Sequence, residues 1–512
     1  MKQEPLKRRR PAARKRGQKQ TLRAVVLSVL AVSVIALCLG IWTRLPGEDV
    51  PVGGVEPPEE VLSPTSSVVT PEPEPEPQPV VETIRFSATG DNLIHSPIYN
   101  QAARRAGGKY SFDYCYEHIA PFYAEQDVNW INQETLCSDT LAPSTYPCFS
   151  TPGDCARALY RAGVRVFSLS NNHTYDKGAS GIAATLQFWE SMPEDVVTTG
   201  LWCGEEDYDR IPLQTVNGVT IAYLSYTEHT NGIRQNKNMT ANVIYTSQRD
   251  VMEQQVRRAR ELADFVVVGV HWGVEDSHKI TQTQRDLAQQ LSDWGADVIL
   301  GTHPHVVQDA EWKTSVDGRQ TFVAYSLGNF LSTQSKPDQL IGAILTMELN
   351  KTTDPDGSVH CAVASPQLHP TVTHYDAGKS NVRTYLFRDY ASELAQAHGA
   401  QIILLAGDLL DSGSPYPETA KALAETFAGC ASEVFLAPGN HDYYSAGAPY
   451  ARLTFPENVH IFRSPRIEAV TLPELGVRVW GAAFTDSRCP ALLRGFSVPK
   501  EPGMLDILCM HA

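Results

Sequence analysis

The stretch Gly301-Thr302-His303-Pro304-His305 follows directly on the apolar run Asp297-Val298-Ile299-Leu300. A β-branched run that ends in two histidines at positions i and i+2 predicts a buried strand with two imidazoles at its carboxyl end. Open α/β sheets place their chemistry at that edge. If the chain stays extended, alternation keeps both rings on one side, where both can reach one metal cluster. The alternative is a pair of histidines in a surface turn.

The same plan is repeated upstream, and this repetition favours the strand. Strand-like segments occur at 83–89, 127–131, 165–170, 221–226, 265–270, 297–300 and 322–326. Helical patterns with apolar residues at three- and four-residue spacing lie between them, at 155–162, 182–190, 249–263 and 282–294. Alternating strands and helices predict a mostly parallel sheet that helices cover on both faces.

Residues of metal-binding type follow five of these strands. In chain order they are Asp91, Glu134, Asn172 with His173, His271, and His303 with His305. Each has a structural explanation when taken singly: Asp91 could cap a turn, for example, and His271 could be a core histidine. Coincidence at five strand ends is a weaker explanation than one shared site. Carboxylate, amide and imidazole ligands together suit Mn, Fe or Zn. One carboxylate that bridges two divalent ions about 3.5–4 Å apart can activate a water and clamp phosphoryl oxygens.

These motifs resemble those of a known family. Gly90-Asp91, Asn132-Gln133-Glu134, Asn171-Asn172-His173, His271-Trp272-Gly273 and the opening stretch look like the CapA-type poly-γ-glutamate capsule biosynthesis proteins, over roughly residues 83–350. These proteins are a branch of the calcineurin-like metallophosphoesterases. The resemblance implies an α/β fold, the calcineurin-like metallophosphatase sandwich.

The resemblance also implies roles for single residues. Asp91 and His305 would hold one ion, Asn172, His271 and His303 the other, Glu134 would bridge them, and His173 would be the general acid. Ordinary members of the fold open with Asp-x-His and use an aspartate as the bridge. Here Asp91 is followed by Asn92 and Leu93, and His95 comes two positions late.

From about residue 391 the plan begins a second time. Strands at 401–406, 433–437 and 505–510 end at Gly407-Asp408, at Gly439-Asn440-His441-Asp442 and at His511. This order resembles ordinary metallophosphoesterases, and it implies Asp408 as bridge, Asn440 and His511 as ligands, and His441 as acid. No Asp-x-His precedes Asp408 and no Gly-His-x-His follows. We expect residues 391–512 to be a truncated phosphoesterase segment, a mis-joined reading frame, or a part that leans on the first domain.

The region before the first strand divides into three parts. Residues 1–23 hold ten Lys or Arg and one acid, which predicts a cytoplasmic tail. Residues 24–43 carry no charge and would rise about 30 Å as a helix, enough to cross a bilayer. The alternative, a cleaved signal peptide, is disfavoured by the long basic region and by the lack of a small-x-small site. Residues 44–82 are a Pro/Glu-rich linker, and residues 83–390 form the CapA-type domain.

Charge and cysteine content limit the partners. A formal net charge of −15 argues against a general nucleic-acid binder. The ten cysteines include no C-x-x-C pair, so we do not expect them to bind metal; some could pair outside the membrane, for instance Cys137 with Cys148.

The expected protein is membrane-anchored and extracytoplasmic, from a Gram-positive-like bacterium. We expect it to hydrolyse a phosphoester or related bond with two divalent ions, during poly-γ-glutamate or envelope polymer synthesis, beside other capsule-synthesis membrane proteins. The alternatives are a non-catalytic polymer-binding or export-complex component, and a nuclease or phosphodiesterase.

Overall fold

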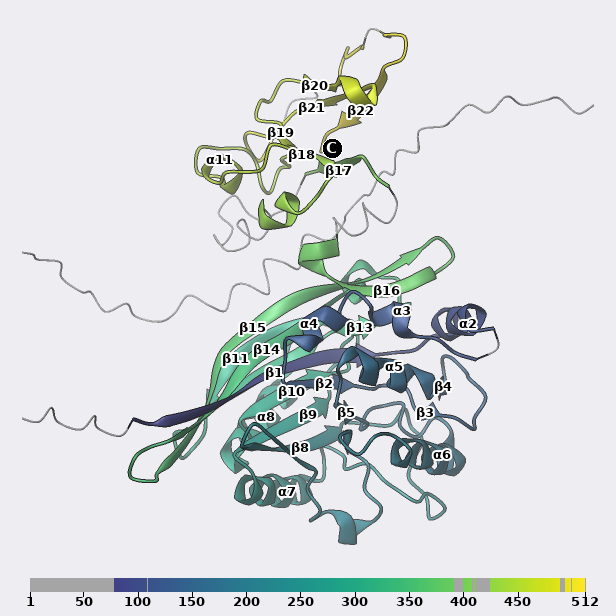
Figure 1. Ribbon diagram of the computed structural model, residues 1–512, viewed down its shortest axis with the longest axis vertical. Coiled ribbons are helices and arrows are strands. Elements are labelled where there is room, and N and C mark those ends of the chain that lie inside the picture. Colours follow the sequence, from purple (N-terminus) through teal and green to yellow (C-terminus); the bar gives the residue numbers. More distant parts are fainter. Residues whose placement is uncertain are drawn as a thin grey trace, which may run out of the picture.

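The computed structural model describes residues 78–107, 109–390, 399–407, 409, 424–488, 493–498 and 500–511. Within these ranges the first domain is a sandwich of two β-sheets, and helices cover the outer side of each sheet (Figure 1). The predicted tail 1–23, the predicted membrane span 24–43 and the linker up to residue 77 lie outside the described residues. No helix of the described ranges is both long and apolar enough to cross a membrane.

Sheet 1 combines a parallel half and an antiparallel half. Its strands, in spatial order, are β16 (Ser380–Leu386), β15 (Val359–Asp376), β14 (Ile341–Thr353), β1 (Val80–Asn92), β2 (Val128–Asn132), β5 (Val166–Ser168) and β6 (Val197–Thr199), and β13 (Asn329–Leu331) also pairs with β1. The strands β1, β2, β5 and β6 run parallel to one another. Their carboxyl ends therefore meet at one edge of the sandwich.

Sheet 2 has a parallel centre with an antiparallel strand at each edge. Its strands, in spatial order, are β11 (Val307–Thr314), β12 (Gln320–Leu327), β10 (Val298–Thr302), β9 (Phe265–His271), β8 (Val219–Thr227) and β7 (Leu213–Val216). The strands β8, β9, β10 and β12 are parallel. A short parallel pair, β3 (Cys137–Ser138) and β4 (Thr151–Pro152), completes the strands of this domain.

Alternation along the strands builds the layers. In β9, Val267 packs between the two sheets, whereas Val266 and Val268 pack under the helices of sheet 2. Those helices are α7 (Arg249–Leu262) and α8 (Gln282–Trp294); sheet 1 is covered by α2 (Ser96–Arg105), α3 (Asp113–Tyr116), α4 (Ala120–Ala124), α5 (Asp154–Ala162) and α6 (Gly178–Glu190). Because both faces of the central strands are buried, they are nearly continuous apolar runs.

The predicted strands and helices of this domain are confirmed, but the single parallel sheet is wrong. Two sheets form, and each carries helices on one face only. Local periodicity identifies a strand without specifying which other strands pair with it, so it could not separate one sheet from two. The resemblance to the metallophosphatase sandwich did predict the layers.

The described cysteines are free thiols, and these include both Cys137 and Cys148. The suggested pairing of these two is therefore wrong. Cys137 is buried against the helices of sheet 1 and behaves as a core residue.

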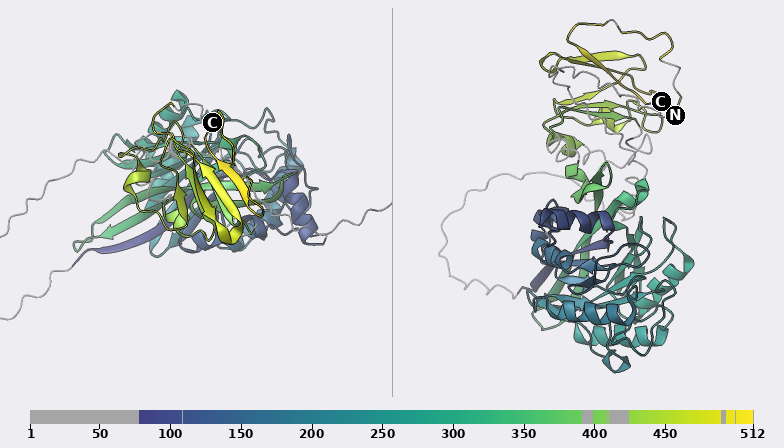
Figure 2. Two further views of the ribbon diagram at one scale, coloured as in Figure 1. Left: turned by 90° about the horizontal axis from the view of Figure 1, so that it is seen from above. Right: turned by 90° about the vertical axis from the view of Figure 1, so that its right-hand side faces the viewer.

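A second, smaller lobe follows residue 399 (Figure 1; Figure 2, right). It contains β17 (Ile402–Ala406), β18 (Glu433–Ala437), β19 (Val459–Ile461), α11 (Pro449–Arg452), and a second sheet of β20 (Glu468–Leu472), β21 (Val477–Gly481) and β22 (Leu505–Cys509). Its three predicted strands are confirmed. Phe435, Phe462 and Val479 pack between its two sheets, so this lobe has a core of its own.

Two glycines let the strands approach closely beside the predicted site. A Cβ added to Gly90 would lie 1.9 Å from the carbonyl oxygen of Gly328, and a Cβ added to Gly301 would lie 1.9 Å from that of Tyr325. Each glycine lies one or two residues before a predicted ligand, Asp91 or His303. The ends of β1 and β10 are therefore both held against the same segment, the end of β12 and the residue after it.

We expect Gly301→Ala to destabilise the first domain by about 3 kcal/mol, because the added methyl group overpacks a buried strand contact. Gly318→Ala is the matched control: Gly318 has a φ of 87° and open space around the added Cβ, so only the left-handed backbone costs energy, about 1 kcal/mol. Denaturant unfolding followed by tryptophan fluorescence measures both. Equal losses in the two variants would contradict the close-contact explanation.

Candidate metal centre

The predicted ligands of the first domain meet at the carboxyl-end edge of the two sheets. Asp91 lies near the end of β1, Glu134 lies two residues beyond β2, and His271 ends β9. Asn172 follows β5, and His303 and His305 follow β10. Every one of these six side chains is buried.

The two histidines after β10 reach the site by a turn, which differs from the predicted extended alternation. The strand ends at Thr302, and the backbone has φ of 98° at His303 and 60° at His305. Non-glycine residues rarely adopt positive φ, and such strain is concentrated at functional sites. Strand pairing ends before these residues, so the pleat could not determine where their rings point.

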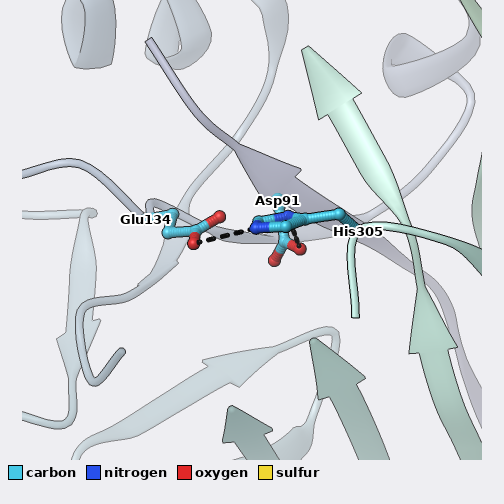
Figure 3. A group of neighbouring side chains, drawn as sticks. All are labelled: Asp91, Glu134 and His305. Atoms are coloured by element: carbon cyan, nitrogen blue, oxygen red, sulfur yellow. Dashed lines mark hydrogen bonds and ion pairs between the residues drawn. The ribbon is translucent and has the colours of Figure 1, made fainter. Parts of the chain in front are cut away.

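Asp91, Glu134 and His305 form one half of the centre (Figure 3). One ligand atom from each lies within 4.8 Å of the other two. The Nδ1 atom of His305 is 3.1 Å from Oδ2 of Asp91, and its Nε2 atom is 3.8 Å from Oε1 of Glu134. The His305 ring thus lies between the two carboxylates.

Asn172, His271 and His303 form the other half. His271 Nε2 lies 3.1 Å from the amide oxygen of Asn172 and 3.1 Å from Nδ1 of His303. The other ring nitrogen of His271 lies 2.9 Å from the hydroxyl of Thr302, a contact that orients the ring. The amide oxygen of Asn172 and Nδ1 of His303 therefore lie equally close to the same ring nitrogen of His271.

Glu134 lies between the two halves. Its Oε1 is 3.7 Å from His271 Nε2 and 3.8 Å from His305 Nε2. Both of its carboxylate oxygens are buried, and neither has a hydrogen-bond partner among the described residues. A buried carboxylate without a partner is costly unless a cation compensates it. The donor set and this buried carboxylate without hydrogen bonds fit divalent cations.

The electrostatics of the pocket favour positive charge at the same place. Burial and the nearby charge of Asp91 raise the pKa of Glu134 well above its ordinary value. Burial opposes protonation of His305, but Glu134 and the hydrogen bond to Asp91 outweigh it and raise the pKa of His305 to about 10. Burial and the neighbouring histidines lower the pKa of His271, and they lower the pKa of His303 to about 3. His271 and His303 are therefore neutral, as metal ligands must be.

His173, the predicted general acid, lies beside the centre and is held by an aspartate. Its Nδ1 is 2.8 Å from Oδ2 of Asp176, and that oxygen also accepts the backbone N–H of Phe149 at 2.6 Å. The Phe149 ring contacts the imidazole edge to face, with centroids 4.7 Å apart. The ring of His173 is thus fixed by a hydrogen bond to Asp176 on one side and by an aromatic contact with Phe149 on another.

Three further residues of the site were not predicted from the sequence. Asp176 orients His173, Thr302 orients His271, and Asn132 donates to Asp91 Oδ1 at 2.8 Å. The spacing of an aspartate three residues after His173 was a usable signal. Thr302 and Asn132 gave none, because they lie inside motifs already assigned to their neighbours.

The second lobe brings together two of its four predicted site residues within the described range. His511 Nε2 lies 2.9 Å from the amide oxygen of Asn440, and His511 Nδ1 lies 3.2 Å from the carbonyl oxygen of Ala406. His441 lies in the loop after β18, next to Asn440. Asp408, the predicted bridge, lies outside the described residues.

Comparisons with known proteins agree with this geometry. Residues 85–334 match the family of the bacterial capsule synthesis protein PGA_cap, and residues 368–498 match the calcineurin-like phosphoesterases. The second match begins inside β15, which belongs to sheet 1.

Two curated relatives are similar to the first domain. The capsule biosynthesis protein CapA of Bacillus anthracis is 32% identical over 236 residues, which are 44% of this chain and 55% of that protein. The PGA biosynthesis protein CapA of Bacillus subtilis (strain 168) is 29% identical over 243 residues, which are 47% of this chain and 62% of that protein. The chain thus spans less than two thirds of either relative.

Among solved structures, the calcineurin-like phosphoesterase YfkN from Bacillus subtilis aligns with a TM-score of 0.34 and 13% identity, over 56% of this chain and 91% of that one. The assignment of the chain rests on the two family matches and the two CapA relatives, and does not depend on this structural alignment. Residues 85–334 of this chain therefore form a PGA_cap-type domain that is similar to the CapA proteins, and a calcineurin-like phosphoesterase segment follows them.

Proposed function

We propose that the first domain is a two-metal hydrolase that cleaves a phosphoester or related bond during synthesis or attachment of an envelope polymer. The observation that carries this proposal is the buried Glu134 carboxylate, which makes no hydrogen bond within the described residues and lies 3.7 Å from Nε2 of His271 and 3.8 Å from Nε2 of His305. A binding site for a neutral group would not need this arrangement. Divalent cations satisfy it.

The ligand roles follow from the two halves of the centre. Asp91 and His305 would hold one ion, and Asn172, His271 and His303 the other, with Glu134 between them. When bound, the ions would supply an activated water and a positively charged clamp for the oxygens of the reacting group. We propose manganese, iron or zinc, because imidazole, amide and carboxylate ligands suit these metals.

His173 would supply the proton that the leaving oxygen needs. The Asp176 carboxylate faces Nδ1, so the Nδ1–H group donates a hydrogen bond to Asp176. This leaves Nε2 as the nitrogen that would protonate the leaving group. Asp176 stabilises the imidazolium and fixes the ring, as a carboxylate does beside a catalytic histidine.

The biological setting is part of the same proposal. The names of the relatives point to capsule or poly-γ-glutamate synthesis. The uncharged residues 24–43 behind a basic tail support a single membrane anchor, with the domains outside the cell and other capsule-synthesis membrane proteins as partners.

One observation favours a second candidate, a polymer-binding domain without catalysis. No histidine stands two residues after Asp91, where ordinary phosphoesterases supply a ligand to the first ion. A binding domain needs no second ion, so the number of bound ions separates the two candidates.

We expect the full chain, loaded with Mn²⁺, to hydrolyse p-nitrophenyl phosphate and to lose this activity in two distinct ways. Glu134→Gln should lower bound metal and activity together, because the bridge is neutralised. His173→Asn should keep the metal and lower kcat by roughly 10²–10⁴-fold, the usual contribution of a general acid. Metal analysis beside steady-state kinetics gives both values.

Wild-type chain that binds no metal and hydrolyses none of several phosphoesters would contradict the hydrolase. One bound ion with no hydrolysis of any phosphoester would favour the binding domain. Loss of metal in His173→Asn would remove His173 from its role as acid, since that role requires an intact centre.

Asp176→Asn should keep both ions and lower kcat by on the order of 10-fold or more, with little change in KM. The neutral amide cannot stabilise the imidazolium. It can also donate to Nδ1, which would favour the imidazole tautomer with its proton on the other nitrogen. Asp139→Asn is the matched control, because Asp139 pairs with Arg157 at the surface and should leave the kinetics unchanged. A rise in KM with an unchanged kcat would show that Asp176 serves substrate binding instead.

A further inference from the structure

The first half of the centre lacks the histidine that ordinary phosphoesterases place two residues after the first aspartate. Leu93 occupies that position. Its neighbour Asn92 is committed elsewhere: its amide group donates to Gln133 at 2.8 Å and accepts the hydroxyl of Tyr116 at 3.1 Å. A ligand for this ion must therefore come from another part of the chain.

His95 is the nearest histidine in sequence, but its hydrogen bonds hold it outside the ligand cluster. Its Nδ1 accepts the backbone N–H of Thr333 at 3.3 Å, and its ring also hydrogen-bonds the backbone of Leu93. The ring packs edge to face on Phe149, with centroids 5.3 Å apart. Within the described part of the chain, the compact group of possible ligands contains Asp91, Glu134 and His305 without His95.

Asn329, unlike His95, contacts the first half of the centre. It lies on β13, in register with Asp91 on β1, and its side chain is buried. Its amide oxygen Oδ1 lies 3.1 Å from His305 Nδ1, the same distance that separates His305 Nδ1 from Asp91 Oδ2. Asn329 and Asp91 thus approach the same ring nitrogen of His305, Nδ1, whereas Glu134 lies 3.8 Å from Nε2.

The orientation of this amide is determined by its other hydrogen bonds. Nδ2 of Asn329 donates to the side-chain oxygen of Gln334 at 2.6 Å and to the backbone oxygen of Gln339 at 2.9 Å. Both donor hydrogens are used, so the amide cannot flip without losing two bonds. The oxygen is therefore held toward His305.

We infer that Asn329 Oδ1 is a ligand of the first ion and replaces the missing histidine. The inference rests on the proposed function, because it requires the two-ion centre. Ligands at right angles about an ion with bonds of about 2.1 Å lie about 3 Å apart, which matches the spacing around His305 Nδ1.

The replacement also changes which metal the first position prefers. An amide oxygen in place of an imidazole gives this ion mostly oxygen ligands, whereas the second ion keeps two histidines. Oxygen-rich sites favour Mn²⁺ over Zn²⁺. The two positions should therefore differ in metal preference.

The test measures bound Mn²⁺ per chain and the electron paramagnetic resonance signal of coupled Mn²⁺ ions in the full-length protein. Asn329→Leu should lose about one ion and the coupled signal, because Leu has a similar volume but no donor atom. Asn329→Asp should keep two ions and the coupling, because it retains the oxygen. His95→Gln should also keep both. The second lobe is identical in all four proteins, so its metal cancels in the differences.

The variants separate a ligand from a structural amide. If Asn329→Asp loses the ion as Asn329→Leu does, the role of Asn329 is donation to Gln334 and Gln339, and the inference is overturned. Loss of the ion in His95→Gln with retention in Asn329→Leu also overturns it and assigns the ligand to His95. Thermal unfolding in EDTA, where no ion contributes, shows whether each variant folds.

The outcome for the proposed function is read from the wild-type chain. If the coupled two-ion signal persists in Asn329→Leu, Asn329 is not a ligand, and the two-metal centre is still supported. Absence of bound Mn²⁺ in the wild-type chain overturns both together.

Discussion

The buried Glu134 carboxylate is the constraint on which the rest of the centre depends. Neither of its oxygens has a hydrogen-bond partner in the described structure, although the side chain is fully buried. An ionised carboxylate in such a place costs on the order of several kcal/mol unless positive charge compensates it. The raised pKa of His305 has the same cause, because a proton on that ring is positive charge that the protein itself supplies next to Glu134. Bound divalent ions would supply positive charge to Glu134 and to the side chains that face it.

The sandwich supplies the geometry that this carboxylate needs. Sheet 1 contributes Asp91, Asn172 and Glu134, and sheet 2 contributes His271 and the turn after β10. The two sets meet because parallel strands of both sheets end at the same edge. Glycine at positions 90 and 301 permits a backbone approach that any side chain would prevent.

The two lobes differ in how many of their predicted site residues meet within the described residues. In the first, the six predicted ligands and His173 converge from both sheets. In the described part of the second, Asn440 and His511 meet beside the end of β17. The second lobe has its own apolar core, so its strands are held together independently of a finished metal centre.

Sequence reasoning was most accurate for local features. The strand ending at Thr302, the helix at 282–294 and the polar residues after each parallel strand follow from apolar periodicity and from where it stops. Strand partners did not follow, so one parallel sheet was predicted where two mixed sheets form. The extended backbone predicted for His303 and His305 was also wrong, because the positive φ of these residues is set by tertiary contacts and not by the residue pattern.

The sequence by itself determined which residues were candidates for the centre, since carboxylate, amide and imidazole groups are recognisable one by one and their strand ends can be located. The tertiary structure decided how each is held. Thr302 behind His271 and Asn329 beside His305 are contacts between segments 31 and 24 positions apart. The physical reason is that a hydrogen bond between distant segments depends on how the sheets pack, and packing leaves no periodic trace along the chain.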